Sequence, residues 1–124
     1  MKTQGYSKTE KLKQKKQVAL LFEKGKWKSS GRLRVISCPV EGLGTMKVGV
    51  SVSKRNFKRA TDRNRIKRLL REAYRLNKSL FASAFGAQGV AMIFWVSKDF
   101  PKHYKEVEAE LVKLCDLLMK KTAD

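Results

Sequence analysis

The residues whose type and spacing best suit a chemical task are arginines, and they are concentrated in one stretch of the chain. The stretch from Arg63 to Arg75 reads RNRIKRLLREAYR and has Glu72 as its only acid. A guanidinium group is a planar fork of N–H donors that binds a phosphate through two parallel hydrogen bonds. The chemistry that these residues suit is therefore the binding of a polyanion, above all of a nucleic acid.

Residues for catalysis by the polypeptide itself are scarce. His103 is the only histidine, which excludes an acid–base mechanism that uses two histidines. Glu106 and Glu110 share a helical face and could hold magnesium, although glutamates in the first turns of a helix are ordinary partners of the helix dipole. Cys38 and Cys115 form no CxxC pair and, with the one histidine, are too few for zinc, so we expect reduced thiols. We predict no catalytic residue and no metal site on the chain.

A helix positions the arginines. Apolar residues at helical spacing, Ile66, Leu69, Leu70 and Ala73, give this stretch one side that is built for burial. At ~100° per residue the opposite arc collects the polar and basic side chains. They are Asn64, Arg68, Arg71 and Arg75, with Lys67 beside them. A merely solvated helix face usually mixes charge signs at i, i+4, so a face of one sign favours an anionic partner.

The whole chain shares the charge of this helix. Its 124 residues include 29 Lys and Arg against 11 Asp and Glu, a net charge of +18, which indicates a nucleic acid or an anionic membrane as partner. The longest apolar run, Val90 to Val96, is far shorter than the ~20 residues of a spanning helix, and the start lacks the apolar core of a signal peptide. We expect a cytoplasmic protein that binds no membrane.

Helix and strand patterns alternate along the chain and predict an α+β fold. The sequence predicts a first helix from Ser7 or Thr9 to about Lys24 that ends at Gly25. Strands follow near 26–28, 33–38 and 46–53, then the basic helix, a central strand over 90–96 covered on both faces, and a last helix from Pro101. Residues 77–88 have no clean period and are expected to finish the basic helix and then form a loop. The result is a single nucleic-acid-binding domain over residues 1–124, loose at 1–8. We expect an α-β sandwich of about four mixed strands and three helices in the order αβββαβα.

One predicted strand has a face of small residues. Between Met46 and Ser53, valine alternates with Gly49, Ser51 and Ser53. Small side chains leave room for a partner to approach the sheet closely. An ordinary solvated face has the same pattern.

The motif around the basic helix resembles the protein subunit of bacterial ribonuclease P. The resemblance rests on Val52-Ser53-Lys54 at the end of a strand, followed by Arg63-Asn64-Arg65-Ile66-Lys67-Arg68 and Arg71, and the flanking helices extend it over nearly the whole chain. It implies a ribonucleoprotein endonuclease that removes the 5′ leader from precursor tRNA, in which the RNA subunit holds the active site and Mg²⁺. It also implies a fold like ribosomal protein S5 domain 2, with a left-handed βαβ crossover. The general rule for parallel strands favours a right-handed one, and we follow the resemblance.

The resemblance also implies two sets of binding residues. The basic helix would bind the catalytic RNA through Arg63, Asn64, Arg65, Lys67, Arg68 and Arg71. A cleft between the first helix and the sheet would bind the single-stranded 5′ leader through Val18, Phe22, Ser51, Ser53, Lys54, Arg55 and Lys98. Family members often carry a second aromatic residue where this chain has Val18, and Arg34 to Ser37 includes no tyrosine or phenylalanine. We therefore expect weaker stacking on the leader.

The residues leave other functions open. A ribosomal or other structural RNA-binding protein without a role in a nuclease would be equally small and basic, and so would a DNA-compacting protein. Phe22 is as well suited to a core contact of the first helix as to a binding role. The resemblance favours a subunit that raises the affinity for substrate and the range of substrates while the RNA performs the hydrolysis. It implies precursor tRNA as a further partner and no DNA.

Overall fold

The fold is organised around one mixed sheet of four strands. The computed structural model describes residues 15–42 and 44–123. The strands are β1 (Lys26–Ser30), β2 (Leu33–Pro39), β3 (Met46–Val52) and β4 (Gly89–Trp95), in the spatial order β1-β2-β4-β3. β2 pairs antiparallel with both β1 and β4, whereas β3 and β4 are parallel.

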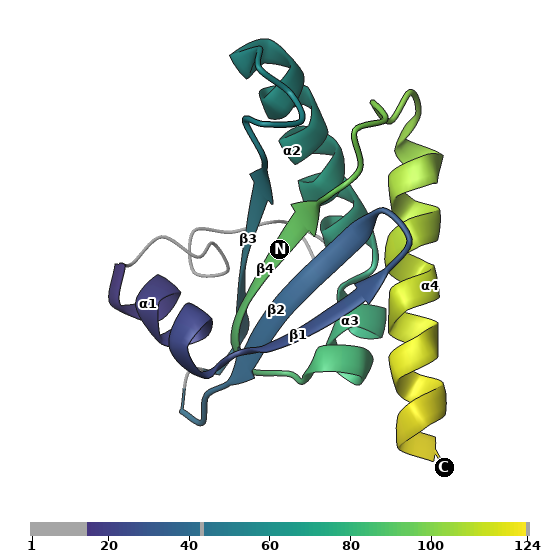
Figure 1. The fold of residues 1–124 in the computed structure, drawn as a ribbon. Helices are drawn as coiled ribbons and strands as arrows, with labels where there is room; N and C mark the ends of the chain where they lie inside the picture. The colour runs from purple at the N-terminus through teal and green to yellow at the C-terminus, as the bar shows by residue number, and fades with distance from the viewer. Residues whose placement is uncertain (1–14, 43, 124) are drawn as a thin grey trace, which may run out of the picture.

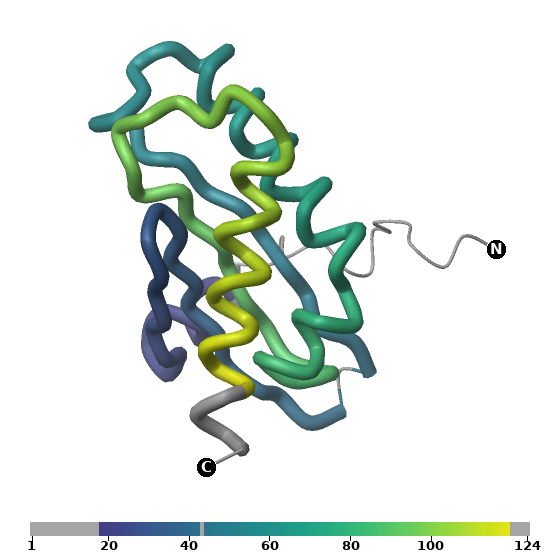
Figure 2. Tube along the Cα trace, turned by 90° about the vertical axis from the view of Figure 1, so that its right-hand side faces the viewer, coloured from purple at the N-terminus to yellow at the C-terminus, as the bar shows by residue number. Residues whose placement is uncertain are grey.

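Helices cover both faces of this sheet. α1 (Lys15–Lys24) lies on one face, and α2 (Ala60–Leu76), α3 (Lys78–Phe85) and α4 (Tyr104–Ala123) lie on the other (Figures 1 and 2). The α+β sandwich with a mixed sheet of four strands is confirmed. Within the described ranges, no helix is both long enough and apolar enough to cross a membrane.

α3 corrects the predicted number of helices from three to four. The chain leaves the helical conformation at Asn77, which has φ −129° and ψ 33°, and a new helix begins at once. Phe81 and Phe85, four residues apart, are buried and stack on each other with ring centroids 4.5 Å apart. The segment was expected to be a loop because its small residues, such as Ser79 and Ala82, give a short helix little apolar periodicity.

The connection from β3 to β4 is a left-handed crossover. Both strands run upward in Figure 1, β4 stands to the right of β3, and Figure 2 places α2 behind the sheet in that view. The chain therefore travels up β3, back down behind the sheet, and up again to the right. The handedness implied by the family resemblance is confirmed, and the general expectation of a right-handed crossover is wrong for this chain.

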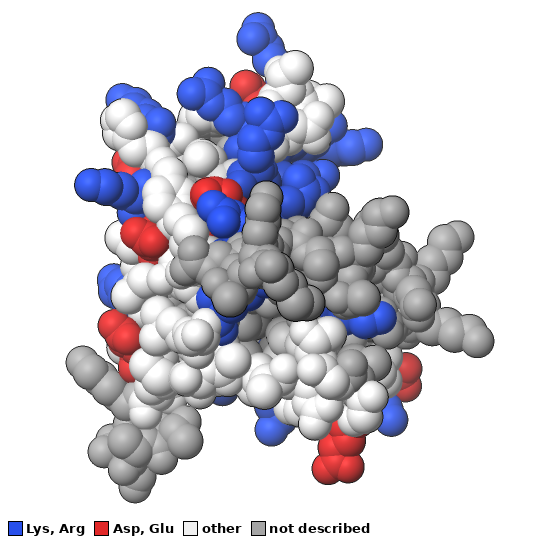
Figure 3. Space-filling model, turned by 180° about the vertical axis from the view of Figure 1, so that it is seen from behind, with Lys and Arg blue, Asp and Glu red and all other residues white. Residues whose placement is uncertain are grey.

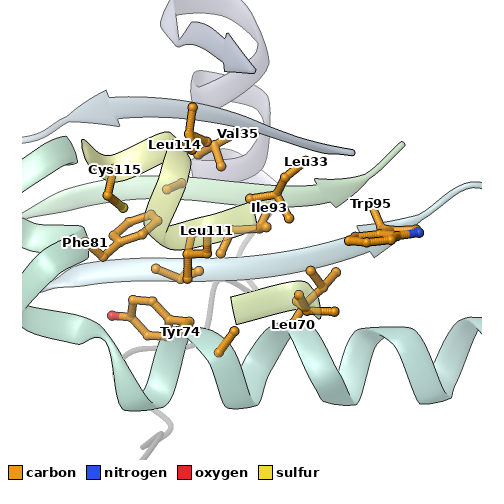
Figure 4. Close-up of a cluster of buried hydrophobic side chains, with 14 of the residues drawn as sticks. Leu33, Val35, Leu70, Tyr74, Phe81, Ile93, Trp95, Leu111, Leu114 and Cys115 are labelled. Atoms are coloured by element: carbon orange, nitrogen blue, oxygen red, sulfur yellow. The ribbon is translucent and has the colours of Figure 1, made fainter. Parts of the chain in front are cut away.

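The main hydrophobic core lies between the sheet and the helices α2, α3 and α4 (Figure 4). Leu70, Phe81, Trp95 and Leu111 are almost fully buried there, and each buried side chain of this kind stabilises the fold by about 1.5–3 kcal/mol. A second, smaller cluster under α1 consists of Leu21, Ile36 and Val90. On that face Met92 and Phe94 of β4 are only half-buried. The expectation that the central strand is covered on both faces therefore holds only in part.

The structure confirms the predicted end of the first helix and corrects the predicted start of the last one. α1 ends before Gly25, whose N–H donates to the carbonyl of Leu21 at 2.7 Å. A Cβ atom at Gly25 would lie 2.3 Å from that oxygen and 2.7 Å from Ile36, so only glycine allows α1 to meet the sheet here. α4 begins at Tyr104 rather than at Pro101. The predicted loose segment 1–8 and the predicted start of the first helix lie outside the described residues.

Candidate RNA-binding surfaces

α2 presents a basic face to the outside of the molecule. Ile66, Leu70, Ala73 and Tyr74 bury its inner side. The outer side carries the residues that we call the basic face: Asn64, Arg65, Lys67, Arg68 and Arg71, of which all but the half-buried Lys67 are exposed. Figure 3 shows lysine and arginine gathered at the end of the molecule where α2 begins. In the part of the chain that the structure describes, the basic face forms no ion pair with a carboxylate.

Two of the arginines at the start of α2 also contact the protein itself. Arg63 Nη1 donates to the carbonyl oxygens of Phe57 and Lys58, at 2.9 and 2.8 Å. The Arg65 guanidinium lies over the ring of Phe100, 5.8 Å from its centroid. Arg63 is therefore partly used in holding the β3–α2 loop to the helix, which the sequence motif does not reveal.

The last turn of α2 carries much less free charge than its start. Arg75 Nε donates to Glu72 at 3.1 Å, and a second hydrogen bond runs from Arg75 Nη2 to the same carboxylate. The hydrogen bonding from Arg75 lowers the pKa of Glu72. The positive field of α2 therefore comes from its first three turns and not from Arg75.

Three of the residues assigned to leader binding, Val18, Phe22 and Ser51, lie on the opposite face of the sheet, beside α1. The register aligns Arg34 of β2 with Phe94 of β4, and Phe94 with Ser51 of β3. Phe22 of α1 approaches this row, with its ring 6.3 Å from that of Phe94. Val18 lies one turn before Phe22 and is half-buried.

The other four residues assigned to leader binding lie in the segments that follow β3 and β4. Ser53 follows β3, and its hydroxyl oxygen accepts the N–H of Arg55 at 3.1 Å. Asn56 then donates to the carbonyl of Val96 at 3.3 Å, which ties this loop to the segment after β4 that carries Lys98. Ser53, Lys54, Arg55 and Lys98 are all exposed. The structure thus places these four residues at one end of the sheet.

Three aromatic rings form a cluster on the α1 face, and two of them were missed by the sequence analysis. Phe22, Trp27 of β1 and Phe94 have ring centroids 5.3–6.3 Å apart. Phe22 is 49% and Trp27 41% exposed, and exposed apolar side chains that lie together often mark a binding site. The guanidinium of Arg34 covers the ring of Trp27 at 4.5 Å. We call these three rings the aromatic cluster.

The expectation of weak stacking overlooked Trp27 and Phe94. It considered only the first helix and the strand of Arg34, where aromatic residues are few. The rings come instead from the strands on either side of β2. The signal that could have found Trp27 is the alternation along the β1–β2 hairpin, which places Trp27 opposite Ile36 on the α1 face.

The two glutamates considered for magnesium have other partners. Glu106 Oε2 accepts the backbone N–H groups of His103 and Lys102, and these hydrogen bonds lower the pKa of Glu106. Glu110 Oε2 accepts from the N–H of Arg32 at 2.6 Å and from its Nε at 3.2 Å. Across residues 15–42 and 44–123, no three histidine, cysteine, aspartate or glutamate side chains come together as a metal site would require. Glu106 and Glu110 are thus both engaged in hydrogen bonds within the protein.

Sequence comparisons identify one family. The model of the family Ribonuclease P matches residues 6–119 of the chain. The chain is similar to the ribonuclease P protein component of Porphyromonas gingivalis, with 36% identity over 119 residues that cover 90% of this chain and 84% of the relative. It is also similar to that of Clostridium botulinum, with 34% identity over 108 residues, 86% of this chain and 92% of the relative.

Solved structures share the fold. The RNase P protein from Thermotoga maritima superposes with a TM-score of 0.70 at 23% identity, covering 90% of this chain and 96% of that one. The Staphylococcus aureus RNase P protein gives a TM-score of 0.68 at 21% identity, covering 87% and 94%.

Proposed function

The chain belongs to the ribonuclease P protein family, and from this premise we propose that it is the protein subunit of a ribonuclease P that removes the 5′ leader of precursor tRNA. In this proposal the chain binds the catalytic RNA and the single-stranded leader, and acts in the cytoplasm. The observation that carries the proposal is the placement of two RNA-binding chemistries on opposite faces of one sheet. α2, which carries the cations, and α1, beside which the aromatic rings lie, cover opposite faces of the sheet (Figure 2).

The basic face of α2 suits folded RNA. In an RNA double helix the major groove is too deep and narrow for side chains to contact base edges, so recognition depends on shape and phosphates. Arg68 and Arg71 are three residues apart on the exposed side of α2 and can contact successive phosphates in the bidentate manner of guanidinium groups. We assign the catalytic RNA to this face and to Arg63.

The aromatic cluster suits the single-stranded leader. Stacking of a base on an aromatic side chain contributes about 1–3 kcal/mol and tolerates any base, because every base has a π face. A subunit that processes many precursor tRNAs needs this tolerance. Ser51, Ser53, Lys54, Arg55 and Lys98 continue from the cluster toward the end of the sheet, where lysine and arginine side chains would hold the leader phosphates.

The chain contributes binding and leaves the hydrolysis to the RNA. His103 is exposed and is the only histidine, so the polypeptide lacks a histidine pair for proton transfer. Mg²⁺ would supply the activation of water and the stabilisation of charge in the holoenzyme, bound mainly by the RNA subunit. Contacts of this chain to the leader raise the affinity of the complex for precursor tRNA over mature tRNA.

Reconstitution with an RNA subunit tests the proposal. We expect no cleavage of precursor tRNA by the chain alone, and leader removal with a lower KM when the chain is added to the RNA subunit at moderate Mg²⁺. A ribosomal or other structural RNA-binding protein, or a DNA-compacting protein, would leave the KM of the RNA unchanged. That result would refute the assignment.

A further inference from the structure

A pocket lies at the end of the molecule opposite the loops that carry Lys54 and Lys98. Its volume is about 290 Å³, near the lower limit of ~300 Å³ for sites that bind small molecules. We call it the lysine pocket, and it is lined by Lys24, Lys26, Lys28, Ser37, Pro39, Ala84, Phe85 and Leu118. Its lining residues come from the five elements α1, β1, β2, α3 and α4, so the pocket forms only when the chain is folded.

The rim of the lysine pocket is positively charged. Lys26 and Lys28 alternate along β1 on the side that faces α4, and Lys24 is the last residue of α1. None of the eight lining residues is acidic. In the described part of the chain these lysines form no ion pair. Three like charges around one cavity repel one another, and an anion bound between them removes that repulsion.

The floor of the pocket is apolar and firmly held. Ala84 and Phe85 come from the end of α3, and Leu118 comes from α4. Phe85 stacks on the buried Phe81, with their ring centroids 4.5 Å apart. Cations above an apolar floor suit a ligand that joins an anionic group to a flat apolar ring. A nucleotide, with its phosphate and base, has this chemistry.

The position of the pocket indicates which RNA it would bind. Pro39 is paired with Gly89 at one end of β4, whereas Ser53 follows the strand end that pairs with Trp95. Six residue steps at ~3.3 Å separate these ends by about 20 Å, too far for one nucleotide to contact both. The pocket also lies on the face of the sheet that carries α2, because its lining residues Ala84, Phe85 and Leu118 come from α3 and α4, which cover that face (Figure 2). The second observation, the face on which the pocket lies, favours the RNA bound by α2 over the leader.

We infer that the lysine pocket binds a nucleotide of the catalytic RNA subunit, with its phosphate at the lysines and its base on the apolar floor. The inference rests on the proposed function for the identity of the RNA. It extends the RNA contact of this chain from the basic face of α2 to the opposite end of the molecule.

A charge-matched pair of variants tests the inference in the reconstituted complex. One variant combines Lys24→Gln, Lys26→Gln and Lys28→Gln, and the control combines Lys102→Gln, Lys105→Gln and Lys113→Gln, which are exposed on and before α4. We expect the pocket variant to lose at least tenfold more affinity for the RNA subunit than the control. The slope of log affinity against log salt should flatten by about 0.7–0.9 for each phosphate that the variant no longer binds. Equal losses of affinity in the two variants would overturn the inference.

A crosslinking experiment does not depend on the stability of the lysine variants. A benzophenone amino acid replaces the exposed Pro39 at the pocket or, as control, the exposed Leu117 on the outer side of α4. We expect light to crosslink the Pro39 position to the RNA subunit and the Leu117 position to neither RNA. Crosslinking of the Pro39 position to precursor tRNA instead, or to neither RNA, would overturn the inference while leader removal still supports the proposed function. Failure of leader removal with the unmodified chain would overturn the proposed function itself.

Discussion

The guanidinium of Arg34 lies over the indole ring of Trp27, with its central carbon 4.5 Å from the ring centroid. The two residues are diagonal neighbours on β1 and β2, because Trp27 pairs with Ile36 and Arg34 pairs with Ser29. A cation–π contact of this kind contributes about 0.5–1 kcal/mol at an exposed site and holds both flat groups in one orientation. The α1 face of the sheet therefore presents an ordered surface for stacking while Trp27 remains 41% exposed.

Trp27→Ala should weaken the binding of precursor tRNA and leave mature tRNA unaffected. Loss of one stacked base at about 1–3 kcal/mol corresponds to a roughly 5- to 150-fold higher Kd for the leader-bearing substrate. Phe22→Ala should act in the same direction. The measurement is the Kd of the holoenzyme for both tRNAs, with Trp27→Phe as the control that keeps a ring. Equal losses for precursor and mature tRNA would contradict a role in leader binding.

Arg68→Ala should weaken binding of the RNA subunit and reduce its dependence on salt. Arg68 is exposed on α2 and has no ion pair among the described residues, so its removal costs the fold little. Removing one side chain that binds a phosphate lowers the salt slope by about 0.7–0.9. A titration of the RNA subunit at several salt concentrations measures both effects. Lys105→Ala on α4 is the matched control, and an unchanged slope in Arg68→Ala would argue against phosphate binding by Arg68.

Arg63→Ala should destabilise the protein as well as weaken RNA binding. Its side chain holds two backbone carbonyl groups, those of Phe57 and Lys58, and charged hydrogen bonds of this kind contribute about 1.5–3 kcal/mol. Denaturant unfolding should therefore give a lower free energy of unfolding for Arg63→Ala than for Arg68→Ala. Similar stabilities of the two variants would show that the loop does not depend on Arg63.

The fold could be predicted from sequence where periodicity and turn residues agree. The alternation of valines predicted the bounds of β3 to within one residue. The apolar stripe from Ile66 to Ala73 predicted which side of α2 is buried. The break at Asn77 and the short helix after it were missed, because eight residues are only about two helical turns and carry too weak a period. The crossover handedness came from the family resemblance, since local sequence pattern contains no information on it.

The binding surfaces were less predictable than the fold. The basic face of α2 is visible in sequence because all its members lie on one helix. The aromatic cluster and the lysine pocket each join residues from three or more elements, and only the register of β1, β2 and β4 brings Trp27 and Phe94 together. The hydrogen bond from Arg32 to Glu110, 78 residues later in the chain, could not be predicted from the sequence either.

Glu108→Gln should make the protein less stable at neutral pH and nearly equal to the unmodified protein in acid. Glu108 on α4 accepts hydrogen bonds from the Tyr104 hydroxyl at 2.6 Å and from Asn77 Nδ2 at 3.1 Å, which joins α4 to the junction of α2 and α3. These hydrogen bonds, the one from Tyr104 first, lower the pKa of Glu108. Burial raises the pKa of Tyr104, so its hydroxyl remains a donor over the whole range.

The sign of the pH dependence follows from the lowered pKa. A carboxylate whose pKa is lower in the folded state stabilises the fold above its ordinary pKa, near 4.5, and this contribution disappears as the pH falls through the lowered value. Urea unfolding at about pH 7 and about pH 3 should therefore show a difference between the two proteins that shrinks in acid. Glu23→Gln on the exposed side of α1 controls for the loss of one charge. A stability difference for Glu108→Gln that is the same at both pH values would show that the ionised carboxylate does not hold this junction.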